Sequence, residues 1–389
     1  MIGLSVLGAT GSIGRQCLDV CRWQPELRPL SMSAGQDWRA LADLARIWKP
    51  EMVAIAEEAA AVPLKEALSG LPIRVEAGPE ALKLAAAWPG VDTVLAAISG
   101  MAGLPPLLAA IDAKKNIALA NKEALVAGGS LVMERAARAG VSIAPVDSEH
   151  SALWQCLAGE RPEQVAKLIL TASGGAFRDI PLEELETVRA EQALQHPNWR
   201  MGEKITIDCA TMVNKGLEVI EAHWLFGVDY EDIQVLVHRE SIIHSLVAFR
   251  DGSVKAQLAQ ADMRLPIQYA LLGRERPPTE IAPPDLATLC CLHFEAPDML
   301  RFPGLAAMIE AGRRGGTAPA YLNGANETLN LAFRRGRLGF PALGRALCRL
   351  LEEYREEPAD VEKRIYEADR QGREDAARLL GADLSLFPR

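Results

Sequence analysis

Long apolar runs are absent from this chain of 389 residues, and no stretch approaches the roughly 20 residues of a membrane-spanning helix. We therefore expect no membrane partner. Acidic residues outnumber basic ones, and the net charge of −9 argues against binding to nucleic acid or to an anionic membrane. Residues 1–8 lack the basic segment that opens a signal peptide and lead directly into a strand-like run.

Cysteine pairs with metal-ligand or disulfide spacing are also lacking. The seven cysteines form no Cys-x-x-Cys motif, and their number is odd. This pattern is typical of reduced thiols in a cytoplasmic protein, and it gives no support for a zinc site.

What the chain does contain is an alternation of short aliphatic runs with helical patterns over residues 1–147. Such alternation predicts an α/β domain with a Rossmann-like, doubly wound parallel sheet. The predicted strands are 4–7, 30–33, 52–55, 91–97, 116–120 and 141–146, and helices are expected at 39–48 and 104–113.

The pattern changes after residue 147. Residues 148–272 predict an α+β catalytic domain, with strands at 167–171, 204–207 and 234–238 and a hairpin from 242–249 to 253–258. Residues 273–298 carry two Pro-Pro pairs and predict a semi-rigid linker. Residues 299–389 are rich in Ala, Leu, Arg and Glu and predict a C-terminal helical bundle.

A glycine-rich loop follows the first predicted strand and opens a helix, which is the context of a dinucleotide-binding loop. Its glycines would let the backbone approach a pyrophosphate. The spacing is Gly-x-x-Gly-x-x-Gly, and a tight turn without a ligand is the alternative. The expected cofactor contacts in this loop are Gly8, Thr10, Gly11, Ser12, Ile13 and Gly14.

The loop after the second strand should meet the adenosine ribose of such a cofactor. Gly35 and Gln36 are the expected contacts, followed by Asp37 and, at a short distance, Arg39. An acidic residue here favours a free 2′-hydroxyl and a basic residue favours a 2′-phosphate. These residues leave NADP and NAD both open.

Carboxylates gather at two places. Asp147 and Glu149 flank Ser148 directly after the last strand of the parallel sheet, and Glu218 is a candidate third ligand. Three oxygen ligands suit Mg²⁺ or Mn²⁺. Taken alone, an Asp-x-Glu sequence is more often a solvated loop.

Residues 208–218 are the most informative stretch of the chain. Asn214, Lys215 and Glu218 stand near the start of an amphipathic helix, at i,i+4 and i,i+3 spacings that place them on one face. A cation for a phosphate and a carboxylate for a metal would therefore lie side by side. Together with the glycine-rich loop, these groups suggest a metal-assisted, cofactor-using enzyme that acts on a small phosphorylated molecule.

Three further segments are candidate ligand contacts. Ser173-Gly-Gly ends a predicted strand and is either an anion cradle or a simple turn. Residues 174–203 are long enough to form a flexible lid, in which His196 and Trp199 stand out. Lys122 follows a strand of the parallel sheet and is either a substrate contact or a surface cation. His150, His244 and His293 are interpreted as structural.

Taken together, these motifs resemble the 1-deoxy-D-xylulose 5-phosphate reductoisomerase family over essentially the whole chain. The segments that carry the resemblance are Gly8 to Gly14, Ala120-Asn-Lys-Glu, Pro145-Val-Asp-Ser-Glu-His, Ser173-Gly-Gly, His196-Pro-Asn-Trp, residues 208–218 and Leu322-Asn-Gly-Ala-Asn-Glu.

The resemblance implies NADPH, a divalent metal and a homodimer, with an isomerisation of the substrate followed by hydride transfer. The implied metal ligands are Asp147, Glu149 and Glu218. The implied catalytic residues are Lys122, Glu149 and His196. Substrate contacts would be Lys122, Ser148, Glu149, Ser173, His196, Trp199, Cys209, Asn214, Lys215 and Glu218, and further cofactor contacts would be Asn121, Glu123, Met201 and Gly202.

The chain departs from the family pattern at Cys209, where a serine is usual at a phosphate contact. A thiol is a weaker donor than a hydroxyl, so the affinity for phosphate should fall unless a backbone amide compensates. The alternatives are a metal-dependent NAD(P) dehydrogenase of another phosphorylated sugar or hydroxy acid, and a nucleotide-sensing scaffold. A scaffold has no reason to keep the acidic residues, and a dehydrogenase would leave the carbon skeleton unchanged.

Overall fold

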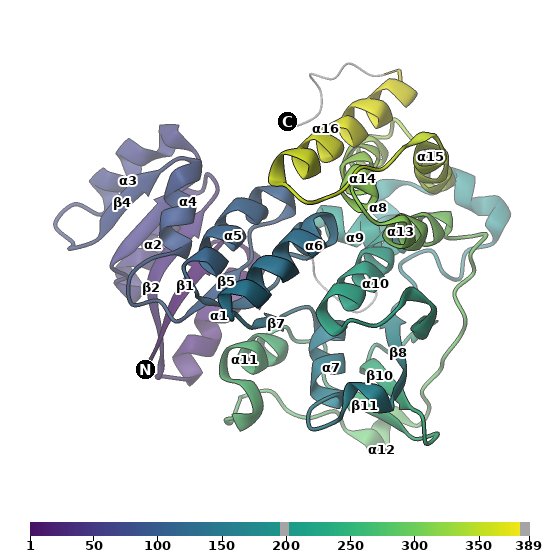
Figure 1. Cartoon of the computed structure of the whole chain (residues 1–389), viewed down its shortest axis with the longest axis horizontal. Coiled ribbons are helices and arrows are strands. Elements are labelled where there is room, and N and C mark those ends of the chain that lie inside the picture. Colours follow the sequence, from purple (N-terminus) through teal and green to yellow (C-terminus); the bar gives the residue numbers. More distant parts are fainter. Residues whose placement is uncertain (195–201, 382–389) are drawn as a thin grey trace. The chain divides into compact units, whose positions relative to one another are not determined.

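The computed structural model describes residues 1–194 and 202–381 (Figure 1). The chain divides into two compact units. The first comprises Met1–Ala124, Val132–Ser151 and Asp262–Ala282, and the second comprises Leu125–Leu131, Ala152–Ala261 and Pro283–Arg389. Among the described residues, no helix combines the length and the apolarity that a membrane span requires.

A seven-stranded parallel sheet of order β4-β3-β2-β1-β5-β6-β7 forms the centre of the first unit. Its strands are β1 (Ile2–Leu7), β2 (Leu27–Ala34), β3 (Met52–Ile55), β4 (Arg74–Ala77), β5 (Thr93–Ala96), β6 (Asn116–Leu119) and β7 (Ile143–Pro145). The strand order reverses between β1 and β5, and ligands of such sheets bind beyond the carboxyl ends of the strands at this point. The predicted Rossmann-like sheet is confirmed.

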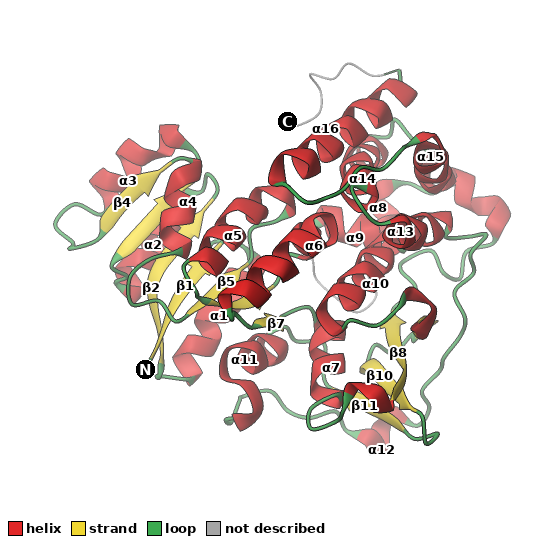
Figure 2. Ribbon diagram, in the orientation of Figure 1, coloured by secondary structure: helices red, strands yellow, loops and turns green. Residues whose placement is uncertain are grey.

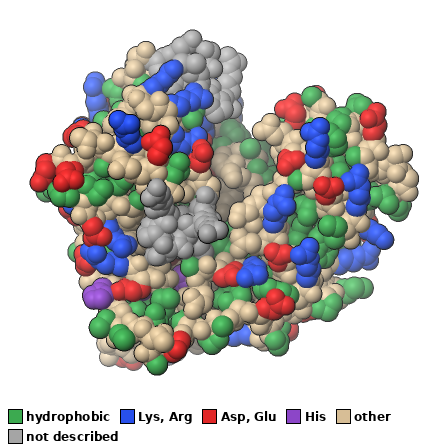
Figure 3. Space-filling model, turned by 180° about the vertical axis from the view of Figure 1, so that it is seen from behind, with side chains coloured by type: hydrophobic (Ala, Val, Ile, Leu, Met, Phe, Trp, Pro, Cys, Tyr) green, Lys and Arg blue, Asp and Glu red, His purple; other side chains and the backbone are tan. Residues whose placement is uncertain are grey.

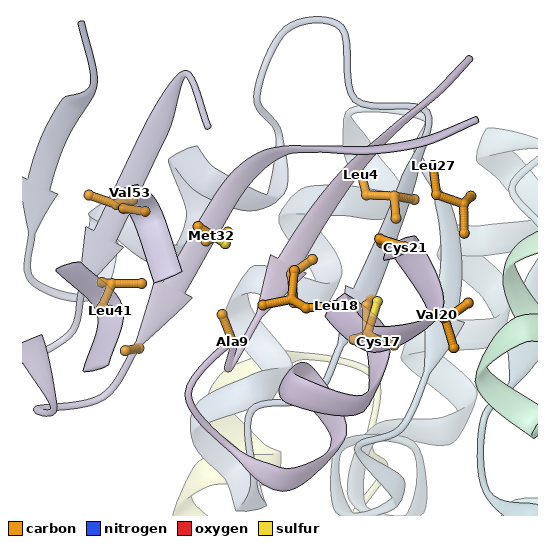
Figure 4. Close-up of a cluster of buried hydrophobic side chains, with 14 of the residues drawn as sticks. Leu4, Ala9, Cys17, Leu18, Val20, Cys21, Leu27, Met32, Leu41 and Val53 are labelled. Atoms are coloured by element: carbon orange, nitrogen blue, oxygen red, sulfur yellow. The ribbon is translucent and has the colours of Figure 1, made fainter. Parts of the chain in front are cut away.

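Helices cover this sheet and build its core. They are α1 (Ser12–Trp23), α2 (Trp38–Trp48), α3 (Ala61–Ala67), α4 (Pro79–Ala86), α5 (Leu104–Asp112) and α11 (Arg264–Leu272). Helix α6 (Lys122–Ala139) follows β6 and is shared between the units, because Leu125–Leu131 belong to the second. Leu4 and Met32 on the sheet and Leu18 and Cys21 on α1 belong to one buried cluster (Figure 4). Burying each such side chain stabilises the fold by about 1.5–3 kcal/mol, which fixes the loop between β1 and α1.

A four-stranded sheet of order β11-β10-β8-β9 lies in the second unit. Its strands are β8 (Val165–Ala172), β9 (Ile233–Val237), β10 (Ile243–Phe249) and β11 (Val254–Leu258). The β8–β9 pair is parallel and the other pairs are antiparallel. The hairpin predicted at Asp251-Gly252 is confirmed between β10 and β11.

The remaining helices surround this sheet or follow it in the chain (Figure 2). They are α7 (Ser148–Cys156), α8 (Ala190–Ala193), α9 (Glu203–Ala210), α10 (Val213–Phe226), α12 (Leu286–Leu289), α13 (Pro303–Arg314), α14 (Ala318–Arg334), α15 (Phe340–Glu353) and α16 (Glu362–Leu379). Helices α13 to α16 pack on one another, which confirms the predicted C-terminal helical region. One face of α10 contributes Val219 and Ala222 to the core of the four-stranded sheet.

The prediction of a strand at 204–207 is wrong, because these residues lie in helix α9. The β-branched residues Ile205, Thr206 and Ile207 favour a strand locally. In the fold, Ile207 and Ala210 are buried at i,i+3 spacing and the Thr206 hydroxyl donates to Gly202 O at 2.9 Å. Packing of a helical face therefore overrides the local preference.

Candidate active site

The glycine loop forms a tight turn between β1 and α1. Gly8 has φ +78°, and a Cβ atom there would lie 2.6 Å from Ala97 O. A Cβ atom on Gly14 would lie 2.3 Å from Gly8 O, so only glycine allows this closure. No side chain caps the N-terminus of α1, and its first turn carries no acidic residue. The backbone amides of this turn therefore fit a pyrophosphate.

Hydrogen bonds connect the glycine loop to the end of β2. The Gly8 amide donates to the Ser33 hydroxyl at 3.2 Å, and the Ala9 amide donates to Ser33 O at 2.7 Å. The structure therefore brings the predicted loop contacts next to the residues that follow β2. Gly35 and Gln36 are exposed there.

Asp37 and Arg39 have distinct positions after β2. Asp37 caps α2, since its carboxylate accepts from the Ala40 amide at 3.0 Å. The Arg39 guanidinium lies 4.5 Å from the centre of the Trp38 ring. The stacking holds this cation in the segment that follows β2.

Asn121 holds the start of α6. Its Oδ1 accepts from the Ala124 amide at 2.9 Å, and its Nδ2 donates to Gly100 O at 2.8 Å and to Ile98 O. The side chain thus joins the loop after β5 to α6. It sets the position of Lys122 and Glu123 in the first turn, beyond the carboxyl end of β6.

Lys122 and His150 both contact Asp147 in the first unit. Lys122 Nζ lies 2.6 Å from Asp147 Oδ2, and His150 Nδ1 lies 3.3 Å from Asp147 Oδ1. Burial alone would raise the pKa of the Asp147 carboxyl, but the Lys122 ammonium and the His150 imidazole hold it well below its usual value. Asp147 is therefore an ionised oxygen donor, the kind of ligand that a hard cation requires.

His150 is a site residue that the sequence interpretation missed. The signal was its i,i+3 spacing from Asp147 at the start of a helix. Next to it, the Ser148 hydroxyl donates to Glu149 Oε2 at 2.6 Å, and the Glu149 amide lies 3.3 Å from Asp147 Oδ1. The Asp147–His150 segment therefore presents two carboxylates held by their neighbours.

In the second unit, the Ser173-Gly-Gly loop follows β8 in close contact with α9. Gly174 and Gly175 have φ of +79° and +71°. A Cβ atom on Gly175 would lie 2.7 Å from both Ala210 Cα and Cys209 O, so the two backbones meet here. The Gly175 amide lies 3.2 Å from Ser173 Oγ. The structure therefore brings Ser173 and Cys209 into one region.

The first turn of α10 carries the predicted polar group. Met212 has φ 56° and turns the chain sharply from α9 into α10. Asn214 Nδ2 donates to Glu218 Oε1, and Lys215 Nζ pairs with Glu218 Oε2. The i,i+4 and i,i+3 contacts expected from the sequence are confirmed.

His244 adds a neutral ring to this region. Burial lowers the pKa of His244 to about 4, and the positive charge of Lys215 acts in the same direction. The sequence interpretation treated this histidine as structural, because a single residue within a strand gives no sign of its neighbours. The imidazole is uncharged at neutral pH.

The predicted metal ligands are divided between the units, with Asp147 and Glu149 in the first and Glu218 in the second. His196, Trp199 and Met201 lie outside the described residues. Gly202 is exposed and caps α9. Part of the segment predicted as a lid is regular, since it contains a short 3₁₀ helix at Leu182–Thr187 and helix α8.

Comparison with protein families gives three matches. Residues 4–129 match the 1-deoxy-D-xylulose 5-phosphate reductoisomerase model, residues 143–226 match the C-terminal domain model of the same name, and residues 258–375 match the DXP reductoisomerase C-terminal domain model. A reductoisomerase of this name from Heliobacterium modesticaldum is 50% identical over 388 residues, covering 96% of this chain and 99% of the relative. One from Geobacillus kaustophilus is 53% identical, covering 90% and 92%.

Solved structures of reductoisomerases are also similar to this chain. The reductoisomerase from Zymomonas mobilis in complex with NADPH has a TM-score of 0.92 and 40% identity, covering 97% of this chain and 99% of that one. A reductoisomerase in complex with NADPH, fosmidomycin and magnesium has a TM-score of 0.93 and 36% identity, covering 98% and 100%.

Proposed function

Because this chain belongs to the 1-deoxy-D-xylulose 5-phosphate reductoisomerase family, we propose that it converts that substrate into 2-C-methyl-D-erythritol 4-phosphate in non-mevalonate isoprenoid biosynthesis. NADPH is the reductant, and Mg²⁺ or Mn²⁺ is required. The single observation in this chain that carries the proposal is the buried Asn214–Lys215–Glu218 group on α10. It places a cation for a phosphate against a carboxylate for a metal.

The metal ligands are Asp147, Glu149 and Glu218. The ionised state of Asp147 and the hydrogen-bonded state of Glu149 suit a hard cation. When bound, such an ion polarises the substrate oxygens and stabilises the negative charge that develops during the carbon–carbon rearrangement. Lys122, paired with Asp147, is placed to hold a proton at a substrate hydroxyl, with Ser148 as a further hydroxyl contact.

Phosphate recognition is assigned to Ser173, Cys209, Asn214 and Lys215. Acidic and basic side chains are mixed over the face drawn in Figure 3, so a phosphate has to be recognised by individually placed groups. Lys215 is 4% exposed, and a cation with so little solvent around it interacts strongly with an anion. The neutral His244 ring adds no competing charge.

NADPH binds at the glycine loop of the first unit, where the amides of the α1 N-terminus receive the pyrophosphate. When bound, the cofactor supplies the hydride that reduces the rearranged aldehyde. Gln36 and Arg39 face the adenosine ribose in this assignment. His196 and Trp199 are assigned to the substrate, and Met201 and Gly202 are assigned to the nicotinamide.

The proposed roles are distributed over successive segments of the chain. Residues 1–147 bind the cofactor and also supply Lys122 and Asp147, 148–272 carry the other metal and substrate groups, 273–298 link, and 299–389 form the helical domain.

The protein acts as a homodimer. Support comes from β11, which is an edge strand of the four-stranded sheet and, among the described residues, has unpaired backbone groups along one side. Seven free thiols support a cytoplasmic location.

The proposal is tested by following NADPH oxidation with 1-deoxy-D-xylulose 5-phosphate, first with Mn²⁺ and then with excess EDTA. Turnover that needs both substrate and metal supports it. Cofactor binding without turnover would instead favour a relative that reduces another phosphorylated sugar or hydroxy acid.

A further inference from the structure

Asp208 of α9 is almost completely buried and faces α14. Its Oδ1 accepts from Asn326 Nδ2 at 2.9 Å and from Asn330 Nδ2 at 2.8 Å. Its Oδ2 lies 3.3 Å from Lys204 Nζ, one turn earlier on α9. Asp208 is 1% exposed, Asn326 0% and Asn330 1%. A carboxylate with no access to water thus joins two helices that are far apart in the chain.

The orientation of the two amides shows what this carboxylate does. Asn326 Oδ1 and Asn330 Oδ1 are buried, and neither accepts a hydrogen bond from any described residue. A buried amide oxygen without a donor is unfavourable. Both amides nevertheless turn their NH₂ groups toward Asp208, and hydrogen bonds to a carboxylate are stronger than bonds between neutral groups. The Asn330 amide also donates to Lys204 O of α9 at 3.0 Å, so Asp208 is the charged centre of the contact between α14 and α9.

The helix that Asp208 anchors also forms one wall of the proposed phosphate site. Cys209 is the next residue, and its carbonyl oxygen lies where the backbone of Gly175 approaches α9. Two residues after Ala210 the chain turns at Met212 into α10, which carries Lys215. Consecutive residues on a helix point about 100° apart, so Asp208 can hold α14 while Cys209 points elsewhere.

We propose that Asp208 is a positioning residue for phosphate recognition. By accepting hydrogen bonds from the amides of Asn326 and Asn330, it fixes the end of α9 against the Ser173-Gly-Gly loop. It also fixes the turn that leads to Lys215. This inference rests on the phosphate site assigned above. It also gives a role to the Asn-Gly-Ala-Asn-Glu segment of α14, which contacts neither substrate nor cofactor in the proposed function.

The test is Asp208→Asn, which keeps the side-chain shape and removes the charge that holds both amides. The KM for 1-deoxy-D-xylulose 5-phosphate and the Ki of inorganic phosphate as a competitive inhibitor should each rise about tenfold, which corresponds to about 1.4 kcal/mol. The KM for NADPH should stay within about threefold, because the glycine loop belongs to the other unit.

Asp369→Asn is a matched control. Asp369 on α16 is also buried, accepts from Asn323 of α14 at 3.2 Å, and pairs with Arg373 on its own helix at 2.8 Å. Its link to α9 runs only through longer ion pairs among the described residues, from Arg373 to Glu327 at 3.5 Å and from Glu327 to Lys204 at 3.7 Å, and it involves neither Asn326 nor Asn330. Asp369→Asn should lower the melting temperature comparably and leave the KM and the phosphate Ki unchanged. Equal increases in both variants would overturn the positioning role, as would no increase in Asp208→Asn.

Two further variants cover the remaining outcomes. If Asp208→Asn does not fold, Asn330→Ala removes a single amide and should raise the phosphate Ki by a smaller factor; an unchanged Ki would count against the proposal. Lys215→Ala separates the two assignments. If it leaves the phosphate Ki unchanged, the phosphate site itself is wrong. If it raises the Ki while a folded Asp208→Asn does not, only the positioning role fails.

Discussion

Lys215 and Glu218 form an ion pair three residues apart on α10, with side chains 5% and 2% exposed. Removing one partner of a buried pair is usually costly, because the other charge is left buried without compensation. In the proposed function the cation meets the substrate phosphate and the carboxylate meets the metal. The following predictions test these roles and the elements around them.

Glu218→Gln should lower kcat by at least about 100-fold. Losing a direct metal ligand should cost no less activity than losing a residue that only supports a ligand through a hydrogen bond. It should also lower the melting temperature, since Lys215 loses its buried partner. The measurement is turnover across a Mn²⁺ titration. NADPH affinity serves as the control for folding. Normal activity at limiting Mn²⁺ would refute the ligand assignment.

Cys209→Ser should keep or improve the affinity for substrate, because a hydroxyl donates a stronger hydrogen bond than a thiol. A fall in KM of up to about fivefold corresponds to about 1 kcal/mol for one improved hydrogen bond. Cys348→Ser is the matched control, since that half-buried thiol donates to Pro303 O instead. A large rise in KM for Cys209→Ser alone would show that this position does not contact the phosphate.

Arg39→Leu should weaken NADP⁺ binding by about tenfold and leave NAD⁺ binding unchanged, because in the proposed function the guanidinium stacked on Trp38 pairs with the 2′-phosphate. Isothermal titration with the two cofactors gives both dissociation constants without turnover. Arg46→Leu, on the same helix but paired with Asp43, should change neither value. An unaltered NADP⁺ to NAD⁺ ratio in Arg39→Leu would remove Arg39 from cofactor selection.

Gly175→Ala should raise the KM for the substrate and destabilise the protein. Its φ of +71° is strained for alanine, and the added Cβ atom would meet α9 at 2.7 Å. Gly252→Ala is the control, because φ is +87° there and no atom lies within 4 Å of the added Cβ. The control should lose about 1 kcal/mol of stability and keep its KM. Identical KM values in the two variants would contradict the close approach of the Ser173-Gly-Gly loop to α9.

His244 should make the protein sensitive to acid. Burial lowers its pKa from 6.5 to about 4, so the unfolded chain binds a proton more readily than the folded chain between these values. The contribution of His244 to the free energy of unfolding is therefore fully present above pH 6.5. As the pH falls toward 4, protonation of the unfolded chain lowers the free energy of unfolding by up to about 3 kcal/mol. His244→Gln should show a flatter dependence in denaturant unfolding at pH 7 and pH 5. Parallel curves for the two proteins would exclude this role.

Local patterns predicted much of the fold. The strand–glycine loop–helix sequence fixes the start of the parallel sheet, and the spacing of Asn214, Lys215 and Glu218 fixes their shared helix face, because both depend on residues close in the chain. The edge strand β4 was missed, since its sequence Arg-Val-Glu-Ala has no apolar run. Helix α9 was misassigned because its β-branched residues are held in a helix by packing.

Contacts between distant segments lay outside what the sequence could predict. Asp208 and Asn326 are separated by 118 positions, and neither residue type alone indicates a partner. The same holds for α11, which returns late in the chain to pack on α1 with Ile267 and Leu271 in the first core. His150 was detectable in principle from its spacing to Asp147. The position of His244 near Lys215 could not be predicted from the sequence.

The most direct test of the central claim is the carbon skeleton of the product. We would incubate the enzyme with 1-deoxy-D-xylulose 5-phosphate, NADPH and Mn²⁺ and identify the product by ¹³C NMR. The account predicts the branched 2-C-methyl-D-erythritol 4-phosphate, formed in step with NADPH consumption. An unbranched reduced sugar phosphate would contradict it, because reduction would then occur without the rearrangement.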